Sequence, residues 1–69
     1  MDNNQIKNNF TYHPPKENQI NKYQALREYG LNLAELINLL CPDSREKSLA
    51  ITKLEETIMW ANASIARNE

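Results

Sequence analysis

The chain has 69 residues, with 8 Lys and Arg against 9 Asp and Glu, for a formal net charge of −1. A chain of this length forms one domain, residues 1–69, and buries only about 60% of the surface that its unfolded form exposes. One cysteine and one histidine exclude an internal disulfide and a Cys/His zinc site. The balanced charge argues against DNA or RNA polymers and anionic membranes as partners. We therefore expect no metal and no cofactor, and oligomerisation as the source of additional stability.

Residues 1–9 read MDNNQIKNN, which is rich in Asn and lacks the apolar segment of a signal peptide. Nowhere in the sequence do 18 apolar residues follow one another, so we expect a cytoplasmic protein without a membrane segment. The next residues, FTYHPP, are extended, because Pro14 keeps His13 out of helical dihedral angles. Residues 1–17 are therefore predicted to form a flexible, extended N-terminal arm.

Apolar residues then recur at spacings of three and four in two segments without internal proline, about 18–41 and about 43–68. Asp43 or Ser44 is the expected N-cap of the second helix, with Glu46 in a capping-box arrangement. The short link between the helices makes them double back on each other. The predicted fold is all-α, an antiparallel two-helix hairpin with an extended N-terminal arm, which assembles into a homo-oligomer.

Both helices carry apolar residues off the stripe that would close the hairpin, which predicts contacts with other subunits. Gly30 costs about 1 kcal/mol relative to Ala inside a helix. It is either a tolerated weak point or a place where another backbone or a ligand approaches closely. The predicted oligomer interface consists of Gly30, Leu31, Met59, Trp60 and Ala63.

A helical hairpin offers little concavity for an active site. Cys41 and His13 are the only thiol and imidazole, and Cys41, directly before Pro42, is better explained as a small buried apolar residue. Glu55 and Glu56 lie about 100° apart on a helix and do not converge on one metal ion. We therefore expect that the protein is not an enzyme.

Aromatic and basic residues offer a different chemistry. Trp60 and Arg67 lie two turns apart on one face, and Tyr12 and His13 lie on the arm. Aromatic rings stack on bases and arginine bonds phosphate in a bidentate manner, which suits a small nucleotide. Trp60 could instead pack in an oligomer core, and Tyr12 could cover the end of a neighbouring hairpin. Asn62 sets the register between subunits or contacts a ligand.

Three segments, FTYHPP, YQALREYG and CPDSREKSLAITKLEETIMWANASIAR, resemble the phage hairpin-domain family of anti-CBASS and anti-Thoeris proteins. These proteins sequester the cyclic nucleotide signals of bacterial immunity. The resemblance extends from about Phe10 to Arg67. It implies antiparallel hairpins that assemble as dimers and, in the anti-CBASS type, as interlocked hexamers built from dimers. It also implies binding without cleavage, in the cytoplasm of the infected bacterial host.

The same resemblance implies ligands and residues. A cyclic dinucleotide would lie between protomers, with Tyr12 stacking on a base and Arg27, in place of a common lysine, reaching a phosphate. Arg67 would line a separate pocket for cyclic trinucleotides. Anti-Thoeris members bind cyclic ADP-ribose isomers and often carry an additional N-terminal region, which this sequence does not show, so a cyclic di- or trinucleotide is the preferred expectation. The full ligand-binding set is Tyr12, His13, Arg27, Asn62 and Arg67.

A rival interpretation is a helical oligomeric adaptor that binds no metabolite. Subunit packing alone would explain every residue except Tyr12, Arg27 and Arg67. A DNA-binding repressor fragment is disfavoured by the charge and by a tight hairpin in place of a helix-turn-helix.

Overall fold

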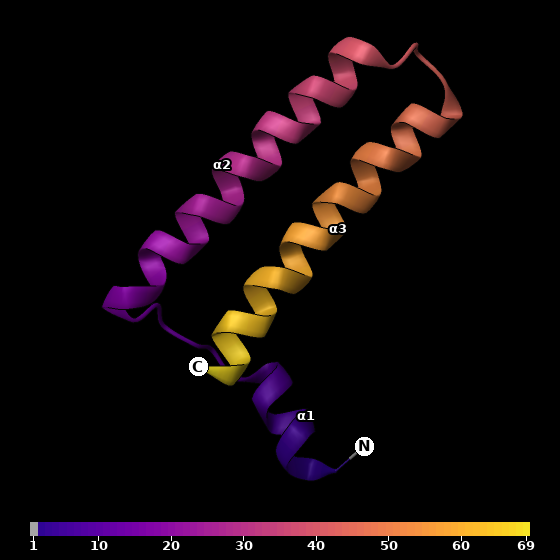
Figure 1. The fold of residues 1–69 in the computed structure, drawn as a ribbon. Coiled ribbons are helices and arrows are strands. Elements are labelled where there is room, and N and C mark those ends of the chain that lie inside the picture. The colour runs from indigo at the N-terminus through magenta and orange to yellow at the C-terminus, as the bar shows by residue number, and fades with distance from the viewer. Residues whose placement is uncertain (1) are drawn as a thin grey trace.

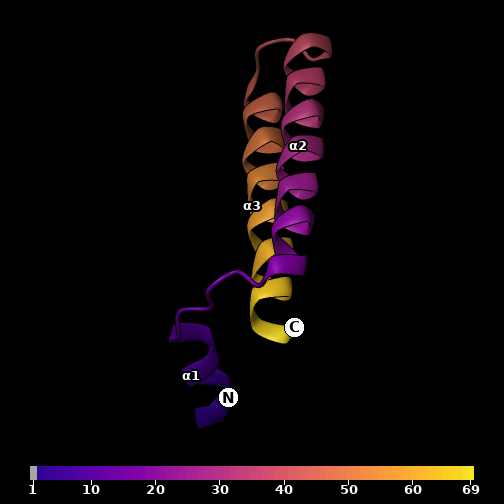
Figure 2. The ribbon, with the colours of Figure 1, turned by 90° about the vertical axis from the view of Figure 1, so that its left-hand side faces the viewer.

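The computed structural model describes residues 2–69 and confirms the all-α hairpin. Its helices are α1 (Asn3–Phe10), α2 (Glu17–Leu40) and α3 (Arg45–Asn68). The two long helices run antiparallel, side by side, and α1 lies beyond the end of α3 (Figures 1 and 2). The molecule measures 44 × 29 × 12 Å, so the hairpin is a thin two-helix layer.

The turn between α2 and α3 is fixed by local hydrogen bonds. The Cys41 N–H donates to Ile37 O at 3.0 Å where α2 ends. Of the two candidate N-caps, Ser44 holds the position, because its Oγ accepts from the Lys47 N–H at 3.1 Å. Asp43 instead pairs with Lys47 Nζ at 3.0 Å. Cys41 is exposed, contrary to the burial expected for it, because it follows the last turn of α2, outside the contact between the helices.

The prediction that residues 1–17 form a flexible, extended arm was wrong for Asn3–Phe10, which form α1; Met1 lies outside the described residues. Asp2 caps this helix, with its Oδ1 accepting from the Gln5 N–H at 2.8 Å. Gln5 Nε2 donates to Asn9 Oδ1 at 2.9 Å, one turn further along. Capping and a turn-to-turn hydrogen bond therefore make helical a segment whose composition alone predicts a coil. Residues 11–16, here called the linker, are non-helical as expected.

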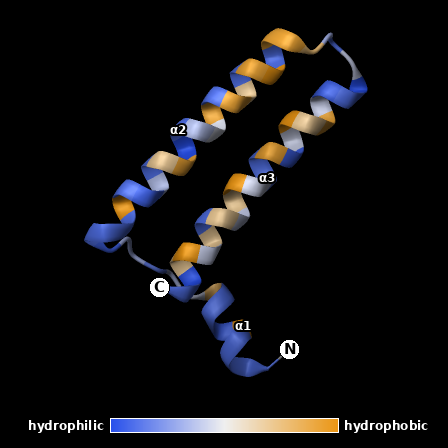
Figure 3. Ribbon diagram, in the orientation of Figure 1, coloured by the Kyte–Doolittle hydropathy of each residue, from blue (hydrophilic) through white to orange (hydrophobic). Residues whose placement is uncertain are grey.

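The hairpin does not complete a hydrophobic core. Among residues 2–69 only Gln19 and Gly30 are buried, and no large apolar side chain is. Apolar residues are distributed along both long helices, whereas α1 is mostly hydrophilic (Figure 3). Leu31, Met59 and Trp60, all predicted interface residues, are more than half exposed. A large apolar surface therefore remains available to a partner.

Within the part of the chain that the structure describes, neither the long helices nor α1 are both long and apolar enough to cross a membrane.

Candidate functional site

A groove of about 360 Å³ lies between the linker and the open end of the hairpin. Its walls come from three segments: the linker, α2 and α3. We call it the linker groove; its lining residues are Tyr12, His13, Pro15, Tyr23, Arg27, Asn62, Ala63 and Ala66. Four of the five predicted ligand-binding residues, Tyr12, His13, Arg27 and Asn62, therefore meet in one place.

Simple features of the sequence create this groove. On α2, Tyr23 and Arg27 are one turn apart and project on the same face. On α3, Ala63 and Ala66 are small, so the wall that they form leaves space beneath the linker. Pro14 and Pro15 keep the linker extended across that space, since proline fixes φ and donates no backbone hydrogen bond.

The groove presents one ring and one cation that are available to a ligand. Tyr12 is 80% exposed, so its ring is not used in packing within the protomer. Arg27 is exposed as well, and the ion pairs formed among residues 2–69 involve lysines instead. A guanidinium without a carboxylate partner can donate two parallel hydrogen bonds to a phosphate.

Asn62 supplies a polar group that packing leaves unsatisfied. Its Oδ1 atom is buried, and no donor within residues 2–69 reaches it. An unsatisfied buried acceptor costs about 1–3 kcal/mol. A hydrogen-bond donor that reached this oxygen from a ligand or a second subunit would recover this free energy.

The model of the Acb2/Tad1 hairpin domain matches residues 2–66. The chain belongs to the Acb2/Tad1 hairpin-domain family. The match includes α1, α2, the linker and nearly all of α3, so it covers every residue that lines the linker groove. No curated protein and no solved structure matches the chain significantly. Membership points to a cyclic-nucleotide sponge of phage origin, which binds its ligand without an enzymatic step.

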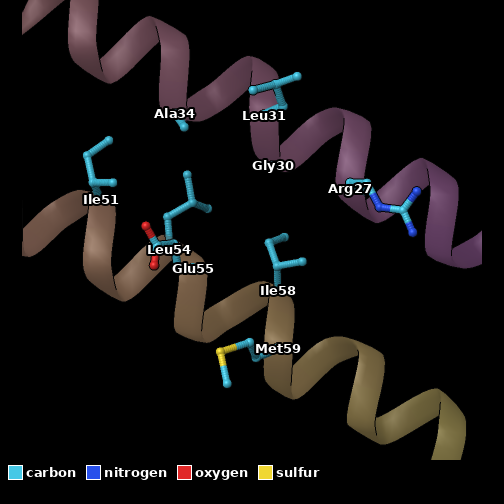
Figure 4. Close-up of a pocket in the computed structure, with 9 residues that line it drawn as sticks. All are labelled: Arg27, Gly30, Leu31, Ala34, Ile51, Leu54, Glu55, Ile58 and Met59. Atoms are coloured by element: carbon cyan, nitrogen blue, oxygen red, sulfur yellow. The ribbon is translucent and has the colours of Figure 1, made fainter.

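A second groove, of about 370 Å³, continues along the hairpin from Arg27 toward the turn. Figure 4 shows Ile51, Leu54 and Ile58 of α3 pointing toward α2, with Gly30 opposite Ile58. We call it the apolar groove; its lining residues are Arg27, Gly30, Leu31, Ala34, Ile51, Leu54, Glu55, Ile58 and Met59. Three predicted interface residues line it, while Ala63 lines the linker groove and Trp60 lines neither.

Arg67 is the predicted ligand residue that does not line the linker groove. Its backbone oxygen accepts a hydrogen bond from Asn8 Nδ2 at 3.1 Å, so this residue holds α1 against the end of α3. The trinucleotide contact assigned to its side chain stays a prediction.

Two contacts at this end of the hairpin were not predicted from the sequence: Tyr23 in the wall of the linker groove, and Asn8 at the end of α3. Tyr23 belongs to the apolar stripe of α2 by its spacing, and only its position one turn before Arg27 could have placed it in the site. Asn8 gave no signal, because its partner lies 59 positions away along the chain.

Proposed function

We propose that this protein sequesters a cyclic di- or trinucleotide in the linker groove and thereby prevents activation of CBASS effectors. The observation that carries the proposal is the meeting of Tyr12 and Arg27, from the linker and α2, beside the unsatisfied amide oxygen of Asn62. Family membership supports the class of ligand.

The predicted ligand-binding residues each have a chemical part in the proposal. The Tyr12 ring stacks on a base, a contact worth about 1–3 kcal/mol. Arg27 donates to a phosphate. His13 and Asn62 offer hydrogen bonds to base edges or sugar hydroxyls. Arg67, at the end of α3, contacts a larger cyclic trinucleotide.

Sequestration requires tight binding and enough copies of the protein, and no bond in the ligand has to break. The signal is titrated below the concentration that its effector needs. A bound ligand also stabilises the folded protein by mass action. The gain is about 2.7 kcal/mol when the free ligand concentration is 100 times the Kd.

We further propose that the protein works as a homo-oligomer, a hexamer built from dimers, with Gly30, Leu31, Met59, Trp60 and Ala63 at the interfaces. The support is energetic, since among residues 2–69 no large apolar side chain is buried within one protomer. A second hairpin in the apolar groove would remove that surface from water, at about 25 cal/mol per Å² of apolar area. Arg27 lies at the junction of both grooves, so assembly and ligand binding would meet at one residue.

The test measures sequestration and ligand integrity together. The protein is mixed with cyclic dinucleotides, cyclic trinucleotides or cyclic ADP-ribose isomers and passed through a filter that retains it. We expect one class of cyclic nucleotide to disappear from the filtrate and to return chemically unchanged after the protein is denatured by heat. A filtrate with the full ligand concentration would contradict binding, and a cleaved product would contradict sequestration. Preferential retention of cyclic ADP-ribose isomers would move the target to Thoeris.

A further inference from the structure

The end of α3 receives hydrogen bonds from residues far away in the sequence. The last carbonyl groups of a helix have no donors within the helix. A glycine after the helix often allows the following backbone N–H groups to donate to them. Here Arg67 O accepts from Asn8 Nδ2 at 3.1 Å, and the main-chain oxygen of Glu69 accepts from Lys16 Nζ at 2.6 Å. One donor precedes the linker, and the other is the last residue of the linker.

The linker is therefore fixed at both ends to the same helix terminus. Asn8 lies before it, and Lys16 is its last residue. A third hydrogen bond joins the linker back to α1, because His13 Nε2 donates to Asn8 O at 2.9 Å. Between these points lies Tyr12, at the edge of the linker groove.

We propose that Asn8 and Lys16 are positioning residues that hold Tyr12 and His13 over the linker groove. This inference rests on the proposed function, because it gives the preformed linker a purpose in ligand binding. A linker already ordered in the free protein loses less conformational entropy when the ligand binds, which raises affinity without any new contact to the ligand.

The structure also indicates why α1 is present. The helix buries no residue, so it adds little to the apolar packing of the hairpin. Its hydrogen bond from Asn8 to α3 is part-buried, whereas the bond from Lys16 is exposed to solvent. Hydrogen bonds shielded from water are the more costly to lose. Asn8 should therefore contribute more to positioning than Lys16 does.

The test compares Asn8→Ala with Asn4→Ala in the full chain. Both variants exchange an Asn of α1 for Ala and raise helix propensity equally, but Asn4 is exposed and forms no hydrogen bond to α3 within the described residues. Amide hydrogen exchange of residues 9–13 and the Kd for cyclic di-AMP and cyclic GMP-AMP are measured. We expect faster exchange and a Kd raised roughly 3- to 10-fold in Asn8→Ala alone, with an unchanged melting temperature of the hairpin.

A double variant separates positioning from general destabilisation. If Asn8 acts through the linker, Asn8→Ala should weaken binding much less in a Tyr12→Ala protein than in the wild type. Lys16→Arg should keep more affinity than Lys16→Met, because it retains a donor. Equal exchange and equal Kd in Asn8→Ala and Asn4→Ala would overturn the inference, as would full additivity with Tyr12→Ala. Absence of binding by the wild type would instead contradict the proposed function, and the exchange measurement would still test the anchoring of the linker.

Discussion

A Cβ atom on Gly30 would lie 2.9 Å from Cγ1 of Ile58, closer than packed side-chain carbons approach each other. The close neighbour of this glycine is therefore the Ile58 side chain from the second helix of the same hairpin. Gly30 is buried, and Arg27 lies one turn before it. The contact between Gly30 and Ile58 thus sets the separation of α2 and α3 beside Arg27, which lines both grooves.

We predict that Gly30→Ala destabilises the protein, although the same change in an open helix would stabilise it by about 1 kcal/mol. The new methyl group would displace Ile58, whose χ1 is restricted in a helix, and overpacking costs about 1–3 kcal/mol. In an Ile58→Ala background the clash is absent, so Gly30→Ala should stabilise instead. Urea unfolding at a fixed protomer concentration measures both values. Stabilisation by Gly30→Ala in the wild-type background would show that the helices do not meet here.

Arg27 should be needed for its guanidinium group as well as for its charge. Arg27→Gln should weaken cyclic dinucleotide binding roughly 10- to 100-fold, because a hydrogen bond to a charged group contributes about 1.5–3 kcal/mol. Arg27→Lys should fall between this variant and the wild type, since lysine keeps the charge without the planar pair of donors.

The matched control is Arg45→Gln, which makes the same charge change at the turn end of the hairpin. Calorimetric titration of all three variants gives the comparison. A similar loss in Arg27→Gln and Arg45→Gln would indicate general charge attraction in place of a phosphate contact.

Assembly should depend on exposed apolar residues. We expect light scattering after size exclusion to give a mass several times the 8.0 kDa of one chain. Leu31→Asp should lower that mass, since it places a carboxylate in the apolar groove, and Trp60→Ala should lower it by removing a large exposed ring. Asn32 is exposed and adjacent to Leu31 but does not line this groove, so Asn32→Asp should leave the mass unchanged. A wild-type monomer at micromolar concentration would refute the assembly.

The free energy of unfolding should decrease at low pH, because Glu69 then becomes protonated. The hydrogen bond from Lys22 Nζ, 2.7 Å from Oε2, is the main cause that lowers the pKa of Glu69 below its ordinary value of 4.5. Because the folded pKa is the lower one, the stabilisation is complete above about pH 4.5 and is lost as the pH falls through the folded pKa. Both side chains are partly exposed, so the effect is small.

The measurement is the melting temperature of the wild type and of Glu69→Gln between pH 2 and pH 7. The wild type should melt slightly higher at pH 7, and the two curves should converge at the acidic end. A difference that stays constant over the whole range would mean that ionisation of Glu69 is not its source.

The hairpin could be predicted because its determinants are local. Apolar spacing, Pro42 and the residues around Ser44 place both long helices within a few residues of their observed ends. The helix α1 could not be predicted from composition, because one of its supports, the hydrogen bond from Asn8 to Arg67 O, joins residues 59 positions apart. Composition alone does not reveal this tertiary contact, which acts together with the local cap at Asp2.

Residue types chosen for their chemistry lead to one groove, and ligand binding by these residues stays a prediction. Tyr12, His13, Arg27 and Asn62 meet as a ligand site would require. A helical wheel gives the face of a residue but not the place where the linker crosses the hairpin. The helical wheel therefore did not predict that Tyr23 lines the linker groove and that Arg67 does not.

Binding of a cyclic nucleotide in the linker groove can be measured by calorimetric titration of the wild type and of Tyr12→Ala. We predict a saturable heat with one cyclic di- or trinucleotide, and a strongly reduced affinity in Tyr12→Ala while the circular dichroism of the two proteins stays the same. No heat with any cyclic nucleotide from a folded wild-type protein, or equal affinity in the two proteins, would contradict it.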